Sequence, residues 1–434
     1  MELIVKLKQH TPMIHFQWDQ EGATLRASEL KPKLDKFLKK KNIIELNSLF
    51  GVKGNLPYNL VITSNNKNSG IDGIGEIKKD KKGKEIYYDS EHKRPKRGPF
   101  PPFFGNTKDT KEKRFVLYDD VQLRFISFEP QVIKALKNFL SEFLFVTNFG
   151  TRQSKGFGSF YVDFSDPIYK KPEEFTKGPN SITRYYFALE VGDGNLYDRY
   201  KSLFYSIDLF YRTLRSGINI KDSNGKTTFY FKSLMFLYAK SKNWTWDKKA
   251  IKEKFVDQSK LNKQKDNHPE SDVLHFFSEE KYLVRDLLGV ASLQNYNSYG
   301  FSLQYDDKNE IQRFKSPILF KPLIEDENKF TVYIILNPLN PGIFGKRFKM
   351  IKKRKDEIEV QDNIELETPP TGNFDLVEFF EFALSKISEI GIDKYVEKGF
   401  QQGDEYNKIR NIYTQLTAQY KNNKKKVEEN HGKE

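Results

Sequence analysis

Two hydrophobic periodicities divide the first 164 residues into strands and helices. Leu3, Val5 and Leu7 alternate along the chain, as in a strand at 2–8 with one buried face. The same patterns predict a helix at 26–41, a strand at 58–64, two strands within 114–129 separated by a turn at Asp119-Asp120, a helix at 130–146 and a strand at 158–164. We expect the first and last of these strands to lie in one sheet.

The first helix carries apolar residues at helical spacing and lysine on its other side. Leu30, Leu34 and Leu38 form the apolar stripe. Ser28 is expected to cap the helix, with Pro32 in the first turn, where its missing N–H costs little.

Residues after Pro179 again mix both periodicities. The patterns predict a strand within 184–192, a long helix at 196–217 that stops at Gly217, helices within 231–241 and 246–255, strands within 299–305, 316–324 and 330–336, and a helix within 375–391.

These elements predict an α+β fold with two ferredoxin-like, or RRM-like, halves. The expected N-terminal domain spans 1–178 and contains a long basic insertion at about 66–112, rich in glycine and proline. The second domain spans 179–400 and carries a helical elaboration. A charged C-terminal helix and tail are expected at 401–434.

Charge and aromatic content narrow the function. Lysine and arginine number 73 against 59 acidic residues, which gives a net charge of +14 and favours a polyanionic partner or a crowded anionic surface. Aromatic residues make up 15 % of the 434 residues, so some are available for stacking on unpaired bases, although most are expected in the core.

Several function classes are excluded or unsupported. The chain has no cysteine, which excludes disulfides, thiolate zinc sites and a cysteine nucleophile. No apolar run is long enough for a signal peptide or a transmembrane helix, so we expect a cytoplasmic protein without a membrane partner. Nothing in the sequence requires a cofactor.

A basic glycine loop, GTRQSKGFGSF, lies between the helix at 130–146 and the strand that follows it. Gly150, Gly156 and Gly158 lack a Cβ, so the backbone there is able to approach a phosphodiester, and Arg152 and Lys155 would neutralise it. The alternative is structural: Gly150 caps the helix, and the later glycines form a bulge that enters a strand. In isolation, the structural interpretation is favoured.

The loop is accompanied by three further motifs in a recognisable order. Together with Thr11-Pro12 and LRASELK at 25–31, the loop resembles the signatures of the RAMP superfamily, the RNA-binding subunits of type III CRISPR effector complexes. FKSPILFKP at 314–322 resembles the serine-proline strand of the Cmr-type member that has two ferredoxin-like halves.

The resemblance implies a non-catalytic RNA-binding subunit of a Cmr-type ribonucleoprotein in antiviral RNA interference. It would contact the guide RNA near its 3′ end and the guide–target duplex, with guide RNA, target RNA and other RAMP subunits as partners. The implied RNA-binding residues are Arg26, Ser28, Lys31, Gly150, Arg152, Lys155, Gly156 and Gly158. Arg26 and Lys31 are alternatively ordinary solvated charges at a helix start.

Two other functions stay open at this point. One is a RAMP-type, metal-independent endoribonuclease that processes guide RNA, for which His15 is the candidate general base. The other is a stand-alone RNA-binding protein. His10 and His15 lie five residues apart around Thr11-Pro12, a spacing that disfavours a shared metal site.

The remaining charged motifs have simple interpretations. Asp119-Asp120 is better explained as turn chemistry than as a metal-binding pair, and Asp72 and Asp80 fall in the insertion. The basic runs at 78–85, 92–97 and 346–355 are solvated by default; on an RNA-binding protein they become phosphate contacts. Phenylalanines beside the second run suit base stacking or docking on a neighbouring subunit.

Overall fold

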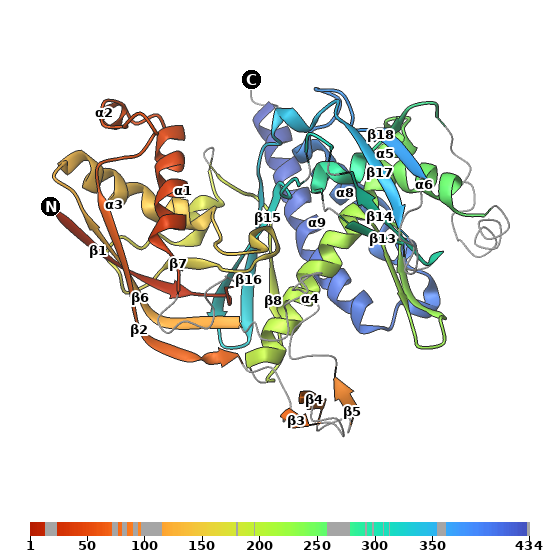
Figure 1. The fold of residues 1–434 in the computed structure, drawn as a ribbon, viewed down its shortest axis with the longest axis horizontal. Helices are drawn as coiled ribbons and strands as arrows, with labels where there is room; N and C mark the ends of the chain where they lie inside the picture. Colours follow the sequence, from red (N-terminus) through yellow and green to blue (C-terminus); the bar gives the residue numbers. More distant parts are fainter. Residues whose placement is uncertain are drawn as a thin grey trace. The chain divides into compact units, whose positions relative to one another are not determined.

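The computed structural model describes most of the chain as two compact units. The described residues are 1–13, 24–71, 77–79, 85–89, 94–96, 115–178, 181–194, 196–257, 278–290, 293–296, 299–306, 308–311, 313–353 and 362–431. Unit 1 comprises 1–207 and 319–335, and unit 2 comprises 208–318 and 336–434. Helices and several sheets occur in both units (Figure 1), which confirms the mixed α+β class.

Unit 1 is built on a four-stranded sheet in the order β2-β6-β1-β7. Its elements are β1 (Glu2–Gln9), α1 (Ala27–Lys40), the short α2 (Ile44–Asn47), β2 (Asn59–Ile71), β6 (Phe115–Ile126), α3 (Pro130–Phe145) and β7 (Phe160–Val162). All neighbouring pairs are antiparallel. The pairing of β1 with β7 confirms that the first and last predicted strands of this segment share a sheet.

The core of unit 1 lies between this sheet and its two long helices (Figure 1). Burial alternates along β1, so that Leu3, Val5 and Leu7 point inward as predicted. The helices meet where Phe37 of α1 packs against Phe143 of α3, with ring centroids 5.6 Å apart. Burial of such aromatic and aliphatic side chains is the main stabilising term for this layer.

The turn predicted at Asp119-Asp120 is wrong, because β6 runs through both residues as one strand. β6 pairs with β2 on both sides of Asp120, at Val121 and at Asp119, and with β1 from Val121 onward. Asp120 adopts a left-handed conformation (φ 49°), which aspartate tolerates better than most residues. A polar pair that is typical of turns is here accommodated within a strand.

A second sheet of unit 1 has the order β15-β16-β8. Its strands are β8 (Tyr186–Glu190), β15 (Ile318–Asp326) and β16 (Lys329–Leu336), all at positions where strands were predicted. The long α4 (Leu196–Arg215) follows β8 and ends before Gly217, whose φ of 73° is the left-handed stop that was expected.

The described residues of the insertion lie in strands. β2 continues to Ile71, and β3 (Ile77–Lys79), β4 (Glu85–Asp89) and β5 (Arg94–Lys96) form an antiparallel sheet. Asp72 and Asp80 lie outside the described residues.

Unit 2 contains a six-stranded sheet in the order β11-β12-β18-β17-β14-β13 and the hairpin β9-β10. The strands are β9 (Ile218–Lys221), β10 (Thr227–Phe231), β11 (Thr245–Trp246), β12 (Lys281–Tyr282), β13 (Leu293–Tyr296), β14 (Phe301–Tyr305), β17 (Arg347–Lys353) and β18 (Asn363–Glu367). The helices α5 (Leu234–Ser241), α6 (Asp247–Phe255) and α8 (Leu376–Ile390) were predicted, and α9 (Asp404–His431) extends through most of the expected tail.

The basic run at 346–355 is not simply solvated. Most of it is β17, in which Phe348 and Met350 alternate inward with the pleat. Lys352 is also buried, and its Nζ donates to the carbonyl of Phe255 at 3.2 Å. The charge run therefore concealed a strand with one apolar face.

Candidate nucleic-acid interface

The glycine loop connects α3 to β7 and is closed by a β-bridge between Asn148 and Ser159. Gly150, Gly156 and Gly158 all have positive φ angles, of 77°, 90° and 65°. Arg152 is also left-handed (φ 54°), just before a single 3₁₀ turn at Gln153–Lys155. Gly150 does not cap the helix, because α3 ends at Phe145 with Val146 as its C-cap.

Two of these glycines are required by the packing of the chain itself. A Cβ on Gly158 would lie 2.0 Å from the carbonyl oxygen of Phe149, and one on Gly156 would lie 2.8 Å from Cγ of Pro322. Both residues are buried. The absence of a side chain is therefore explained within unit 1, and approach of these glycines to RNA stays a prediction.

Thr11 and Pro12 hold the second half of the loop. The Thr11 hydroxyl donates to the carbonyl of Gly156 at 2.6 Å and accepts from the N–H of Ser159 at 2.9 Å. The N–H of Gly158 donates to the carbonyl of Pro12 at 3.0 Å. Threonine suits this position because its hydroxyl is both donor and acceptor.

The start of α1 holds the first half of the loop through Glu29. This carboxylate accepts from the N–H of Gly150 at 3.0 Å and from Nε2 of Gln153 at 3.1 Å. Lys33 pairs with the same carboxylate at 2.8 Å. The loop is thereby fixed against the first turn of α1, which lies within the LRASELK motif.

The helix starts differently from the prediction. Arg26, not Ser28, is the N-cap residue, and no side chain caps the helix. Ser28 is the second helical residue, and Pro32 lies inside the helix, where its missing N–H leaves the carbonyl of Ser28 without its usual donor. Arg26 and Ser28 are both exposed, whereas Arg152 is half-buried.

Lys321 of β15 binds both ends of the glycine loop from inside the core. Its side chain is fully buried, and Nζ donates to the carbonyls of Thr147 and Phe160 at 2.9 and 2.8 Å and to Oδ1 of Asn148 at 3.3 Å. Burial holds the pKa of this lysine well below its usual value. The loop, Thr11-Pro12, the LRASELK motif and residues 319–322 of the fourth motif therefore meet in unit 1.

His10 is a further buried group that sequence reasoning considered only as a partner of His15. Its Nδ1 accepts from the N–H of Ile324 at 2.9 Å, so the neutral ring carries its proton on Nε2. Burial, and then the charges of Lys321 and Lys8, lower its pKa well below 6.5. His10 thus braces β15 and is not placed to act as a general base. His15 lies outside the described residues.

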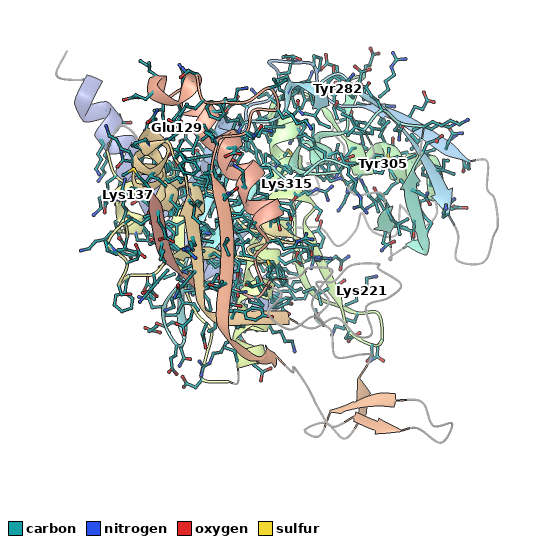
Figure 2. All side chains as sticks on the ribbon, turned by 60° about the vertical axis from the view of Figure 1, so that its left-hand side comes forward. Glu129, Lys137, Lys221, Tyr282, Tyr305 and Lys315 are labelled. Atoms are coloured by element: carbon teal, nitrogen blue, oxygen red, sulfur yellow. The ribbon has the colours of Figure 1, made fainter. Side chains whose placement is uncertain are left out.

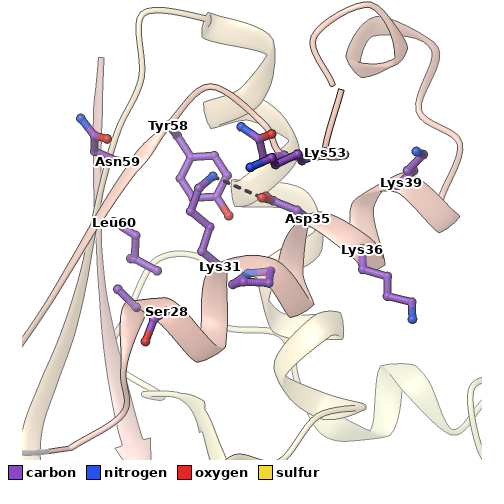
Figure 3. A pocket seen from close by; sticks show the side chains of 13 residues that line it. Ser28, Lys31, Asp35, Lys36, Lys39, Lys53, Tyr58, Asn59 and Leu60 are labelled. Carbon is purple, nitrogen blue, oxygen red and sulfur yellow. Dashed lines mark hydrogen bonds and ion pairs between the residues drawn. The ribbon is translucent and has the colours of Figure 1, made fainter. Parts of the chain in front are cut away.

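A pocket of about 860 Å³ opens between α1 and the segment that leads into β2 (Figure 3). Lys31 lies in its wall, with Nζ 3.2 Å from Asp35, 2.8 Å from the carbonyl of Leu56 and 3.4 Å from the ring centre of Tyr58. Burial lowers the pKa of Lys31, although Asp35 opposes that shift. Lys36, Lys39 and Lys53 line the same pocket.

The comparison with protein families decides the identity. Residues 1–218 match the family model for the Cmr1 N-terminal domain, and residues 230–411 match that for the Cmr1 C-terminal domain. The chain belongs to the Cmr1 family. Cmr1 proteins are RAMP subunits of the Cmr complex of type III CRISPR systems, so other Cmr subunits are implied as partners. No curated protein matches the chain at a significant level.

Two features are absent from the described part of this Cmr1-family chain. Within the described ranges, no three histidine, aspartate or glutamate side chains are grouped so as to hold a metal ion. Of the helices in the described part of the chain, none is long and apolar enough to cross a membrane.

Sequence reasoning identified Lys31 but missed Glu29 and the other pocket lysines, Lys36, Lys39 and Lys53. Glu29 lies within a quoted motif, but a hydrogen bond to a loop 121 residues away leaves no local signal. Lys321 was detectable in principle, because it interrupts an apolar strand, and burying a charge there costs free energy unless the charge is compensated.

Proposed function

We propose that this Cmr1-family chain is a non-catalytic RNA-binding subunit that contacts the guide RNA near its 3′ end and the guide–target duplex. Guide RNA, target RNA and neighbouring RAMP subunits are its proposed partners. The proposal rests on one observation above others: Thr11, Glu29 and Lys321 fix a basic loop against the exposed start of α1.

A preformed loop of this kind suits a phosphate backbone. Arg26 is exposed at the start of α1, and Arg152 lies half-buried in the loop that is tied to it. Arginine suits this role because it binds phosphate in a bidentate manner. Ser28 adds an exposed hydroxyl, and Lys31 a cation, one turn along α1. Nζ of Lys155 is buried, so we expect Arg26 and Arg152 to contribute more to RNA affinity than Lys155.

The proposed fold is a pair of ferredoxin-like halves. In the first, the β-α-β-β-α-β element order and the strand order β2-β6-β1-β7 support it. In the second, β8, α4, β15 and β16 repeat the first part of that element order, and β15-β16-β8 repeats the corresponding strand order. The domain limits near residues 178 and 400 belong to the same proposal.

A salt titration of RNA affinity tests the function. We expect the double variant Arg26→Gln, Arg152→Asn to weaken binding to all single-stranded RNAs alike and to reduce the slope of log affinity against log salt by about 1.4, or 0.7 per phosphate contact. Asparagine is chosen at 152 because it tolerates the left-handed backbone.

The matched control is Lys134→Gln, Lys137→Gln, which removes the same charge from exposed positions on α3 (Lys137 is labelled in Figure 2). This control should change the slope by much less. Equal slopes for the wild type and the Arg26/Arg152 variant would refute the proposed interface.

The endoribonuclease alternative is tested separately. The proposal expects repeat RNA to stay intact when it is incubated with the pure protein without metal. Discrete cuts that disappear in His15→Ala would show that the chain is an enzyme instead.

A further inference from the structure

The pocket between α1 and β2 presents one helical face to one connecting segment. Its lining residues on α1 recur at spacings of three and four, as on a single face of a helix: Ser28, Lys31, Pro32, Asp35, Lys36 and Lys39. The opposite wall consists of residues from 53–60. A volume of about 860 Å³ lies within the range of roughly 300–1,000 Å³ that is usual for small-ligand sites.

The charges around the pocket are unbalanced. Four lysines and one aspartate line it, and the aspartate is already paired with Lys31. Lys36, Lys39 and Lys53 form no ion pair with any described residue, and Nζ of Lys39 lies over the ring of Phe50, 5.9 Å from its centre. Three cations therefore remain for an anionic ligand.

The uncharged lining is suited to a nucleobase. Ala27, Pro32 and Leu60 supply apolar surface, and the amides of Asn55 and Asn59 supply both donors and acceptors for a base edge. Tyr58 is not the stacking platform, because Nζ of Lys31 already covers its ring (Figure 3). The base would instead lie against Pro32 and Leu60.

We propose that this pocket binds one unpaired nucleotide of single-stranded RNA, with its base inside and the adjoining phosphates at Lys36, Lys39 and Lys53. This proposal rests on the RNA-binding function proposed above. The new element is that one RNA base must leave its stacked neighbours to enter the pocket. A continuous duplex does not permit this, because its bases stay paired and stacked. The pocket therefore makes the subunit sensitive to whether the RNA beside it is paired.

The test fills the pocket without changing its charge. Asn55→Trp places a large ring in the pocket from an exposed position. We expect affinity for single-stranded RNA to fall by about tenfold, the effect of losing one well-bound base. Affinity for a blunt duplex of the same sequence should stay within about twofold, and the salt slope should be unchanged.

A fluorescent base reports the pocket directly. Single-stranded RNAs that carry 2-aminopurine at successive positions should show, at one position, a fluorescence increase on binding to wild type, because the base is unstacked there. Asn55→Trp should abolish that increase. If melting curves show that Asn55→Trp does not fold, Asn59→Trp repeats the test, because Asn59 is the other exposed asparagine that lines the pocket.

The charged rim is tested with a matched pair of triple variants. Lys36→Gln, Lys39→Gln, Lys53→Gln should lower the salt slope for single strands by up to about 2. Lys40→Gln, Lys134→Gln, Lys137→Gln removes the same charge from exposed lysines that do not line the pocket, and should lower it much less.

The outcomes separate this proposal from the function on which it rests. Wild type that binds no RNA at low salt would overturn both. If RNA binds but Asn55→Trp matches wild type, the nucleotide pocket is wrong and the RNA-binding function stands. The nucleotide pocket is also wrong if Asn55→Trp loses affinity equally for single strands and for the duplex. It is likewise wrong if the triple lysine variant keeps the RNA affinity of wild type but loses binding of an acidic peptide.

Discussion

Unit 1 buries Lys321 among backbone carbonyls, whereas unit 2 buries Arg285 between carboxylates. No acidic residue in the described part of the chain pairs with Lys321, and burial lowers its pKa. Arg285 pairs with Asp247, and its guanidinium also donates to Gln294 and to Tyr296 at 3.1 and 3.0 Å. Burial opposes the charge on Arg285, but the neighbouring carboxylates overcome it and raise its pKa.

The second network continues to Asp286. Its carboxylate pairs with Arg215 at 3.1 Å and accepts from the hydroxyl of Tyr305, which Figure 2 labels. Two arginines thus face two aspartates, and the buried charge is balanced. The cation of unit 1 instead joins backbone segments to one another, which suits the positioning of a loop.

The largest effect should follow removal of one charge from the balanced network. Asp247→Asn keeps the shape but leaves Arg285 without its principal counter-charge. We expect the free energy of unfolding of unit 2 to fall by about 3–5 kcal/mol, as for other broken buried pairs. Urea unfolding measures this. A loss under 1 kcal/mol would mean that the network does not stabilise unit 2.

Lys321→Met should lower the free energy of unfolding by less than Asp247→Asn does, because it removes the buried amino group together with its desolvation penalty. The carbonyls of Thr147 and Phe160 lose a donor, which costs about 1–3 kcal/mol. Amide hydrogen exchange at Gly158 and Ser159 should accelerate, because the loop loses its internal anchor. Unchanged exchange there would show that Thr11 and Glu29 suffice to hold the loop.

The smallest effect is the pH dependence of Lys321. Its pKa is depressed in the folded state, so unfolding takes up a proton at any pH between the folded pKa and the unfolded value of about 10.5. The contribution of Lys321 to the free energy of unfolding is therefore fully present above pH 10.5 and is lost as the pH falls through the folded pKa. The stability of wild type relative to Lys321→Met should therefore rise from pH 7 to 9.5, as urea unfolding would show. A difference that is flat or falls with pH would contradict the depressed pKa.

The elements of unit 1 were largely predictable, because Leu3, Val5 and Leu7 follow the period of their strand. Local signals failed at Asp119-Asp120, where strand pairing overrides turn preference. At 346–355 a high lysine content concealed the alternation of Phe348 and Met350.

The candidate site was predictable as motifs but not as an arrangement. Gly156 faces Pro322, and Thr11 faces Ser159, across separations in sequence that no pattern encodes. The pocket was missed for the same reason, since Lys36 and Lys53 come from segments that only the folded chain brings together.

Photocrosslinking of an assembled Cmr complex tests the central claim most directly. A guide RNA would carry 4-thiouridine at single positions, and crosslinked peptides of this subunit would be identified by mass spectrometry. We predict crosslinks from positions near the 3′ end to the glycine loop at 148–159 and the start of α1. Efficient assembly with no crosslink to either segment, or crosslinks confined to unit 2, would contradict the account.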